Sequence, residues 1–299
     1  MKQIICFLAA TIMGTSSYGQ TDNSNSKDLL SKLQSELGSQ KGLFALAFKD
    51  LQTGRTILWN EHAVFHAAST MKTPVMIEVY KQVAAGKFSL SDSIVVKNEF
   101  KSIVDSSVYH LSAGDDSEPE LYKRAGTKIP LAELVYQMII MSSNLATNII
   151  MELVDAKKVT QTMRDLGAMD IQVLRGVEDA RAYAKGLNNT ITAYDLLMIF
   201  EKMAMDKIIN KKVCTDMIRI LLDQKHNSII PARLPKEVKV AHKTGFITGL
   251  HHDSGIVFLP DGRKYILVIL SKGLEDEKAA VESMARVSEF IYLDVINDH

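Results

Sequence analysis

The chain has 299 residues, of which 46% are hydrophobic and 23% are charged, a composition typical of a globular protein with a large core. Lysine plus arginine equals aspartate plus glutamate, 35 of each, so the formal net charge is zero. This balance offers no basic excess for nucleic acid and no acidic excess for a solvating tail, and we expect no nucleic-acid partner.

The first residues have the pattern of a secretion signal, which we assign to 1–19. Lys2 supplies a positive charge, and the apolar run over 4–13 is too short to span a bilayer. Ser17 and Gly19 are small residues at the two positions that a signal peptidase reads. We therefore expect an exported protein, periplasmic or secreted, that starts at Gln20 and has no stable membrane span after processing. The alternative is a buried N-terminal helix.

Loss of this segment would also remove Cys6 and leave Cys214 as the single cysteine. No intramolecular disulfide could then form, although the compartment would allow one. Stability must therefore come from the core. We expect the mature chain to be a monomer.

The N-terminal part of the mature chain alternates between helix and strand patterns. After a polar, flexible lead-in, we expect a helix over 28–37, strands over 43–48 and 56–59, and a helix over 69–85 that Gly86 ends. The polar stretch 98–128 is typical of a long loop or a loosely helical excursion.

The rest of the chain returns to regular patterns. Apolar spacing predicts helices over 131–141, 144–154, 159–166, 193–205 and 211–222, strands over 238–242, 254–259 and 265–271, and a last helix over 275–296.

This order of elements predicts an α+β fold. Strands near both ends with helices between them indicate one antiparallel sheet of about five strands, flanked by the N- and C-terminal helices. An all-helical lobe would be inserted in the middle. We place the catalytic domain at 20–299, with the sheet lobe at about 28–87 and 225–299 and the helical lobe at about 88–224.

Three short motifs could carry chemistry. In Ser69-Thr70-Met71-Lys72, helical spacing lets the lysine amine reach the serine hydroxyl and act as the base that a serine nucleophile needs. Ser142-Ser143-Asn144 falls at a helix junction, and Lys243-Thr244-Gly245 closes a predicted strand. Each alone could be a helix cap or a strand end, and residues 24–27 also fit the first pattern.

Together, in this order, the motifs resemble those of class A β-lactamases and penicillin-binding proteins. Segments 65–93 and 190–199 are also similar to that family, and the resemblance covers about residues 30–295. It implies a β-lactamase/transpeptidase-like fold and a β-lactam or peptidoglycan-like small-molecule substrate. We expect no cofactor and no metal.

The resemblance also implies residue roles. Ser69 would attack the carbonyl, Lys72 would accept a proton, and Ser142 would relay a proton to the leaving nitrogen. Glu178, which follows Ser142 by 36 residues, would activate the hydrolytic water. Backbone N–H groups of Ser69 and Phe246 would form the oxyanion hole, and the substrate would be held by Asn144, Lys243, Thr244 and Gly245.

Two positions depart from the family pattern. Ser143 stands where the family has an aspartate, and Ala182 stands where it has an asparagine that anchors the hydrolytic water. Three functions therefore remain open: a serine β-lactamase acting through an acyl-Ser69 intermediate, a penicillin-binding or D-Ala-D-Ala-directed peptidase or an esterase on the same fold, and a sensor or binding domain that acylates and stops or does no chemistry at all.

A separate cluster, His251-His252-Asp253, could suggest a metal site. Neighbouring residues on a strand point to opposite faces, and no H-E-x-x-H sequence is present, so the pattern disfavours a metal role. We expect instead that they face solvent or support the Lys243 strand.

Overall fold

The computed structural model describes the backbone of residues 18–297 and the side chains of residues 27–297. Most of the predicted secretion signal lies outside these residues, so its processing stays a prediction. Within the described part, no helix is long and apolar enough to cross a membrane.

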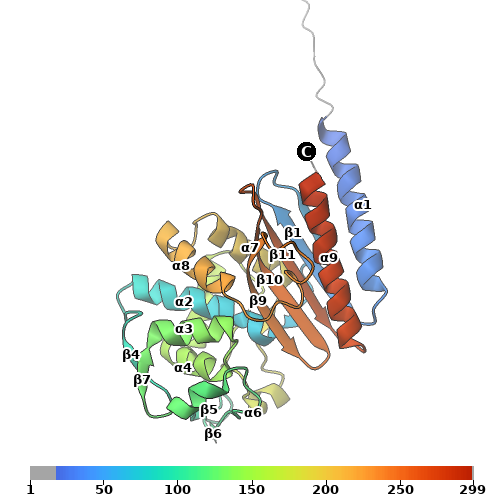
Figure 1. Cartoon of the computed structure of the whole chain (residues 1–299). Coiled ribbons are helices and arrows are strands. Elements are labelled where there is room, and N and C mark those ends of the chain that lie inside the picture. Colours follow the sequence, from blue (N-terminus) through green and yellow to red (C-terminus); the bar gives the residue numbers. More distant parts are fainter. Residues whose placement is uncertain (1–17, 298–299) are drawn as a thin grey trace, which may run out of the picture.

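A five-stranded antiparallel sheet forms the centre of the molecule. Its strands lie in the order β2-β1-β11-β10-β9, so the N-terminal pair completes a sheet begun by the C-terminal strands (Figure 1). Strand β1 pairs with β11 from Leu43 opposite Lys272 to Asp50 opposite Tyr265. The α+β prediction is confirmed. The strands are β1 (Leu43–Asp50), β2 (Thr56–Trp59), β9 (Lys239–Ile247), β10 (Leu250–Phe258) and β11 (Lys264–Lys272).

Two terminal helices, α1 (Tyr18–Gly38) and α9 (Glu277–Asn297), lie side by side over one face of this sheet (Figure 1). Leu29, Leu33 and Leu37 recur at helical spacing on α1 and are buried in this layer. The lead-in that we expected to be flexible is helical in backbone from Tyr18 onward.

The opposite face of the sheet carries the main core and the other helices. Along β1, Phe44, Leu46 and Phe48 belong to the α1/α9 side, whereas Ala45 and Ala47 belong to the helical side, as the two-residue period of a strand requires. Helix α7 packs against β1, β10 and β11, and α2 packs against α4 and α5. The helices are α2 (Lys72–Ala84), α3 (Leu131–Ile140), α4 (Asn144–Val154), α5 (Ala156–Asp165), α6 (Ala180–Ala184), α7 (Ala193–Ala204) and α8 (Lys211–Leu222).

The stretch 98–128 is held by short strand pairs at its ends. Strand β5 (Phe100–Lys101) pairs with β6 (Val108–Tyr109), and β4 (Ser93–Val95) pairs with β7 (Lys128–Pro130). A 3₁₀ helix, η2 (Pro119–Arg124), follows the first pair. Strands of two or three residues are too short to give a periodic signal, so the sequence predicts only a long loop or a loosely helical excursion here.

Candidate active site

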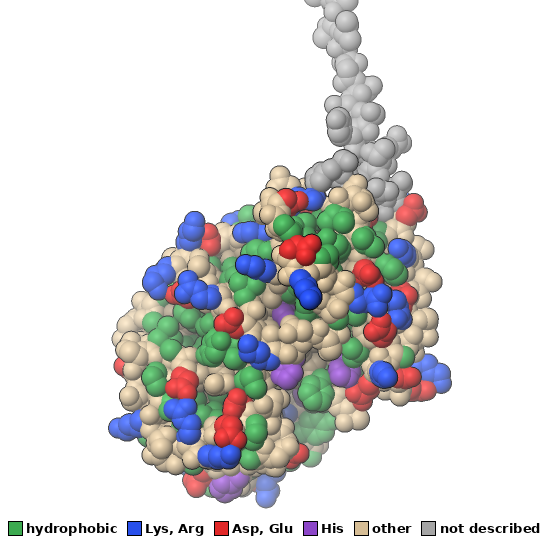
Figure 2. All heavy atoms as spheres, in the orientation of Figure 1, with side chains coloured by type: hydrophobic (Ala, Val, Ile, Leu, Met, Phe, Trp, Pro, Cys, Tyr) green, Lys and Arg blue, Asp and Glu red, His purple; other side chains and the backbone are tan. Residues whose placement is uncertain are grey.

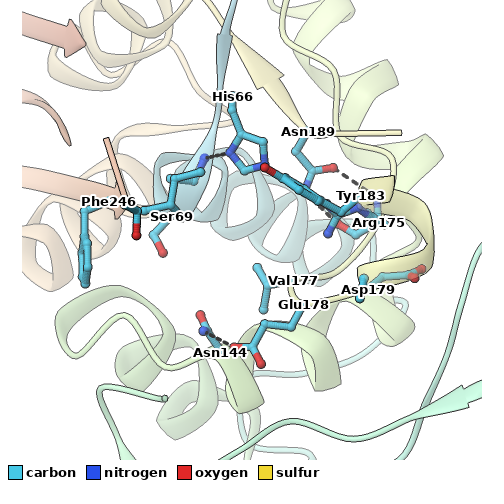
Figure 3. A pocket seen from close by; sticks show the side chains of 14 residues that line it. His66, Ser69, Asn144, Arg175, Val177, Glu178, Asp179, Tyr183, Asn189 and Phe246 are labelled. Carbon is cyan, nitrogen blue, oxygen red and sulfur yellow. Dashed lines mark hydrogen bonds between the residues drawn. The ribbon is translucent and has the colours of Figure 1, made fainter. Parts of the chain in front are cut away.

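Ser69 lies where the sheet and the helices meet. It belongs to a 3₁₀ turn, η1 (Ala68–Met71), that runs directly into α2, so the predicted helix has a tighter first turn than expected. Ala68 before it has a φ of 43°, a strained conformation for a residue with a Cβ. Ser69 opens onto two adjoining cavities of about 540 and 700 Å³, which share Asn144, Glu178 and Phe246. Figure 3 shows Ser69 and Phe246 on one side of the first cavity, with Asn144 and Glu178 on the other.

The Lys72 ammonium reaches across to the second motif. Its Nζ donates to the Ser142 backbone oxygen at 2.6 Å, to Ser142 Oγ at 3.3 Å and to Asn144 Oδ1 at 2.8 Å. These are the contacts seen for Lys72 among the described residues; the expected bond to the Ser69 hydroxyl is not one of them. The lysine is therefore held between Ser142 and Asn144, one helical turn beyond Ser69.

Burial controls the charge of Lys72. Its side chain is fully buried, and this loss of solvent lowers its pKa to about 7, although Asp116 and Glu178 act in the opposite direction. A substantial fraction of the amine is then neutral near pH 7. Such a group can both donate and accept a proton under physiological conditions.

Ser142 lies between two lysines. Its Oγ accepts from Lys243 Nζ at 3.0 Å as well as from Lys72. Both acceptor positions of the hydroxyl are thus used, and its own proton is free to be donated. Lys243 is fully buried, and burial together with the nearby Lys72 charge lowers its pKa. Ser142 itself has a φ of 62°.

Glu178 lies beside Asn144 on the same side of the cavity. Its Oε1 accepts from Asn144 Nδ2 at 2.6 Å, and Figure 3 shows this bond. Glu178 also has a positive φ, 60°. The surrounding protein raises the pKa of Glu178 by removing solvent, with a smaller contribution from Asp116 and Asp115.

The backbone before Glu178 is fixed by α4. Asn148, one turn after Asn144 on this helix, accepts from Val177 N–H at 2.7 Å and donates to the Val177 oxygen at 3.0 Å. A Cβ at Gly176 would lie only 2.3 Å from Asn148 Oδ1, so a glycine is required there. Asn189 closes the other end of the segment, hereafter the 174–189 loop, by bonding the backbone of Leu174 and Arg175.

Strand β9 is an edge strand and leaves its outer backbone groups available. On β10, both the N–H and the oxygen of His251 bond to Ser271 Oγ of β11. Phe246, the residue opposite His251, therefore directs its N–H away from β10 and off the free edge. A Cβ at Gly245 would lie 3.0 Å from the Ser69 nitrogen, so this edge runs directly beside the 3₁₀ turn.

The residues 251–253 have separate partners, as expected for neighbours on a strand. His251 pairs with Glu277 on α9 at 2.8 Å, and Asp253 accepts from His242 Nδ1 at 2.8 Å behind Lys243. Buried His252 donates from Nε2 to the His66 oxygen, and burial lowers its pKa to about 4. Across the described residues, no group of three His, Cys, Asp or Glu side chains is arranged to hold a metal.

Ala182 does not take part in the cavity as an anchor. It is fully buried inside α6, where its N–H donates to the Asp179 cap at 3.0 Å. Ser143 is also fully buried, and its Oγ caps α4 by accepting from the Ala146 N–H. Both departures from the family pattern are therefore structural residues here.

Two groups of residues were missed by the sequence analysis. Asp116, from the 98–128 stretch, contacts the start of α4 with its buried carboxylate. His66, Arg175 and Tyr183 form a third wall of the cavity beside Ser69 (Figure 3). No local motif marks either group, because each depends on long-range contacts.

Away from the cavity, the face in Figure 2 shows charges of both signs interspersed.

Known proteins share this architecture. A β-lactamase structure from Sphaerobacter thermophilus has a TM-score of 0.76 and 23% identity, over 91% of this chain and 98% of that chain. A β-lactamase from Bacteroides uniformis is 22% identical over 284 residues, 89% of this chain and 90% of its own length. One from Rhodobacter capsulatus is 29% identical over 158 residues, 52% of this chain; this match spans only 48% of that relative.

The fold and the convergence of the three motifs define the class as β-lactamase-like serine hydrolases. A sequence profile of the β-lactamase enzyme family matches residues 28–295, and the chain belongs to that family.

Proposed function

We propose that the protein opens the amide of β-lactams through an acyl-Ser69 intermediate. The observation that carries this proposal is that Ser69 and Ser142 line one cavity, while the buried Lys72 and Lys243 both donate hydrogen bonds to the Ser142 hydroxyl. A nucleophile, a base with a pKa near neutrality and a proton donor are the groups that acyl transfer requires.

In the first step, Ser69 Oγ would attack the lactam carbonyl and pass its proton to neutral Lys72. The C–N bond would then break, and the leaving nitrogen would take a proton from Ser142, which Lys72 replenishes. N–H groups of Ser69 and Phe246 would stabilise the oxyanion. Lys243 and Thr244 would bind the substrate carboxylate, Asn144 would hold its amide, and Gly245 would let it lie along the edge of β9.

In the second step, a water molecule would attack the acyl ester. Glu178 would take the proton of this water, and the acyl C–O bond to Ser69 would then break, with that proton passed to Ser69 Oγ as the acid product departs. The raised pKa of Glu178 makes its carboxylate a better proton acceptor.

The nucleophile can be tested by mass spectrometry after incubation with a slowly hydrolysed β-lactam. We expect the acyl adduct on the peptide that contains Ser69, and its loss in Ser69→Ala together with several orders of magnitude of turnover. Ser24→Ala, in the other S-x-x-K sequence, is the matched control and should label as wild type does. Adduct that survives Ser69→Ala would overturn the assignment.

The role of Glu178 separates a β-lactamase from a penicillin-binding relative. Glu178→Gln should still acylate but accumulate acyl-enzyme, because the amide cannot take the proton of the water. Two observations favour the relative: Ala182 is buried and cannot help to hold the water, and Glu178 is bonded directly to Asn144. If wild type itself stays acylated for hours, the penicillin-binding function replaces the β-lactamase. If both proteins turn over alike, another group activates the water.

We also propose that the mature protein is exported and begins at Gln20. The support is the short apolar run over 4–13 and the small residues Ser17 and Gly19. The intact mass of the protein isolated from its native host should match a chain that starts near Gln20. A full-length mass would contradict the proposal.

A further inference from the structure

We propose that Asp116 supplies the carboxylate that the second motif lacks at Ser143, and that it positions Asn144 and Ser142 for catalysis. This inference rests on the proposed function. It makes Asp116 a positioning residue, brought to the site from the 98–128 stretch instead of from the motif itself.

The contacts of Asp116 converge on the start of α4. Its Oδ2 accepts from the backbone N–H of Asn144 at 2.9 Å and of Leu145 at 2.8 Å, and from the Tyr122 hydroxyl at 2.9 Å. Its Oδ1 accepts from Glu118 N–H at 3.0 Å, and the side chain is buried. A buried carboxylate on two N-terminal N–H groups of a helix is favourably placed for both hydrogen bonding and the helix dipole.

This carboxylate is linked to the catalytic groups through Asn144. Asp116 accepts from the backbone N–H of Asn144. The side chain of Asn144 accepts from Lys72 through Oδ1 and donates to Glu178 through Nδ2. A shift of Asn144 would therefore disturb the proposed bases of both steps. Asp116 thus acts on the chemistry through Asn144, without lining either cavity.

Ser143 and Asp116 touch, which makes their exchange possible. Ser143 Oγ lies 3.4 Å from Asp116 Oδ2, and both side chains are buried. Ser143 is the N-cap of α4, a position at which aspartate is as favourable as serine. The double variant Asp116→Ser/Ser143→Asp therefore transfers the carboxylate from the 98–128 stretch to the adjacent N-cap position of α4. The amino-acid composition of the chain stays the same.

The charge of Asp116 also acts on Lys72. The charged groups that influence this lysine are Asp116 from the 98–128 stretch, Glu178 from the 174–189 loop and Lys243 from β9. The two carboxylates favour its ammonium form, and Lys243 disfavours it. Loss of the Asp116 charge should therefore allow Lys72 to lose its proton at lower pH.

The test compares four proteins: wild type, Asp116→Asn, the exchange variant, and Glu120→Gln as control. Glu120 is an exposed acid on η2 that pairs with Lys123, so its loss removes one charge from the same segment without touching α4. The first readout is the rate of acylation by a fluorescent penicillin between pH 5 and 9. The second is the titration of Lys72 by NMR with ¹³Cε-labelled lysine, its signal assigned by its loss in Lys72→Arg.

We expect Asp116→Asn to lower the acylation plateau by on the order of 10²-fold, because Asn144 is misplaced. The acidic limb of its profile and the Lys72 titration should both move to lower pH. The exchange variant should recover most of the plateau and return both titrations toward wild type, and Glu120→Gln should match wild type. Unchanged values in Asp116→Asn, or an exchange variant that folds without recovery, would overturn the proposal.

The two readouts separate this proposal from the proposed function. If wild type does not acylate, the β-lactam-directed function fails, and the Lys72 titration still decides whether Asp116 sets the charge state of the site. If wild type acylates and the Asp116→Asn titration does not move, Asp116 is only a helix cap. A melting curve of each variant shows that the proteins compared are folded.

Discussion

Lys72 combines complete burial with three oxygen partners, and this environment sets the pH at which it can act. Since its pKa is lowered to about 7, acylation should rise as pH increases through this value, where the amine becomes neutral. We expect single-turnover acylation rates to fall about tenfold per pH unit well below this pKa. A rate constant between pH 5 and 9 that does not depend on pH would show that Lys72 is not the base.

The same burial has a consequence for stability. The pKa of Lys72 is near 10.5 in the unfolded chain and about 7 in the folded one, so the unfolded state binds more protons between these values. This group therefore contributes increasing stability as pH rises from 7 toward 10.5.

Relative to Lys72→Met, wild type should gain up to ~1.4 kcal/mol of unfolding free energy per pH unit over this range. Urea unfolding of both proteins at pH 7, 8 and 9 measures the difference. A difference that does not change with pH would mean that the lysine keeps an ordinary pKa in the fold.

At the scale of elements, the 174–189 loop depends on one close approach to α4. Gly176→Ala would drive a Cβ toward Asn148 Oδ1, now 2.3 Å from where that atom would lie, and displace the backbone that carries Glu178. We expect deacylation to slow by on the order of 10²-fold, with a smaller effect on acylation. Stopped-flow acylation and acyl-enzyme decay separate the two steps.

Gly38→Ala serves as the control for Gly176→Ala, because a Cβ at Gly38 meets nothing within 4 Å. Equal effects of Gly176→Ala on both steps would indicate general unfolding of the site instead of a displaced Glu178.

The elements that the sequence predicted least well are those that carry the site. Strand β10 was expected to start at 254 and β9 to end at 242, yet they run over Leu250–Phe258 and Lys239–Ile247. The missing parts contain His252, Asp253 and Lys243, polar residues that interrupt the apolar pattern although they are fully buried. At a functional site, buried positions hold polar residues that the chemistry requires. The alternation of apolar residues, from which strands are predicted, is therefore interrupted there.

The motif residues themselves could be found from sequence, because resemblance to a family fixes their order along the chain. Asp116 could not be found in this way. Its contacts with α4 join residues that lie 28 and 29 positions apart, and nothing in its local sequence distinguishes it from Asp115 beside it. Only the path of the 98–128 stretch through space shows which of the two carboxylates is buried.

At the scale of the whole molecule, the sheet separates two cores. Leu33 of α1 is fully buried in the core on the α1/α9 face, whereas the face toward Ser69 is covered by the other helices. Leu33→Ala should cost about 2–5 kcal/mol of unfolding free energy, because it leaves a cavity. The turnover of the folded protein should stay unchanged, since the cavity lies behind the sheet.

Chemical denaturation and activity of the same sample measure both effects. Leu293→Ala, on the more exposed side of α9, is the control and should change stability little. Loss of turnover without loss of stability in Leu33→Ala would show that the two faces of the sheet are coupled.

The position of β1 between β2 and β11 also constrains how the chain matures. The hairpin of β1 and β2 pairs with β11, a strand synthesised more than 200 residues later. The chain between β1 and β11 must therefore form a closed loop when the two strands pair. Ser69 and Lys243 lie toward opposite ends of that loop, so we expect the site to form only when the sheet is complete. A ribosome-bound or truncated chain without β11 should therefore not react with β-lactams. The amount of acylated Ser69 would then measure the number of completely folded molecules.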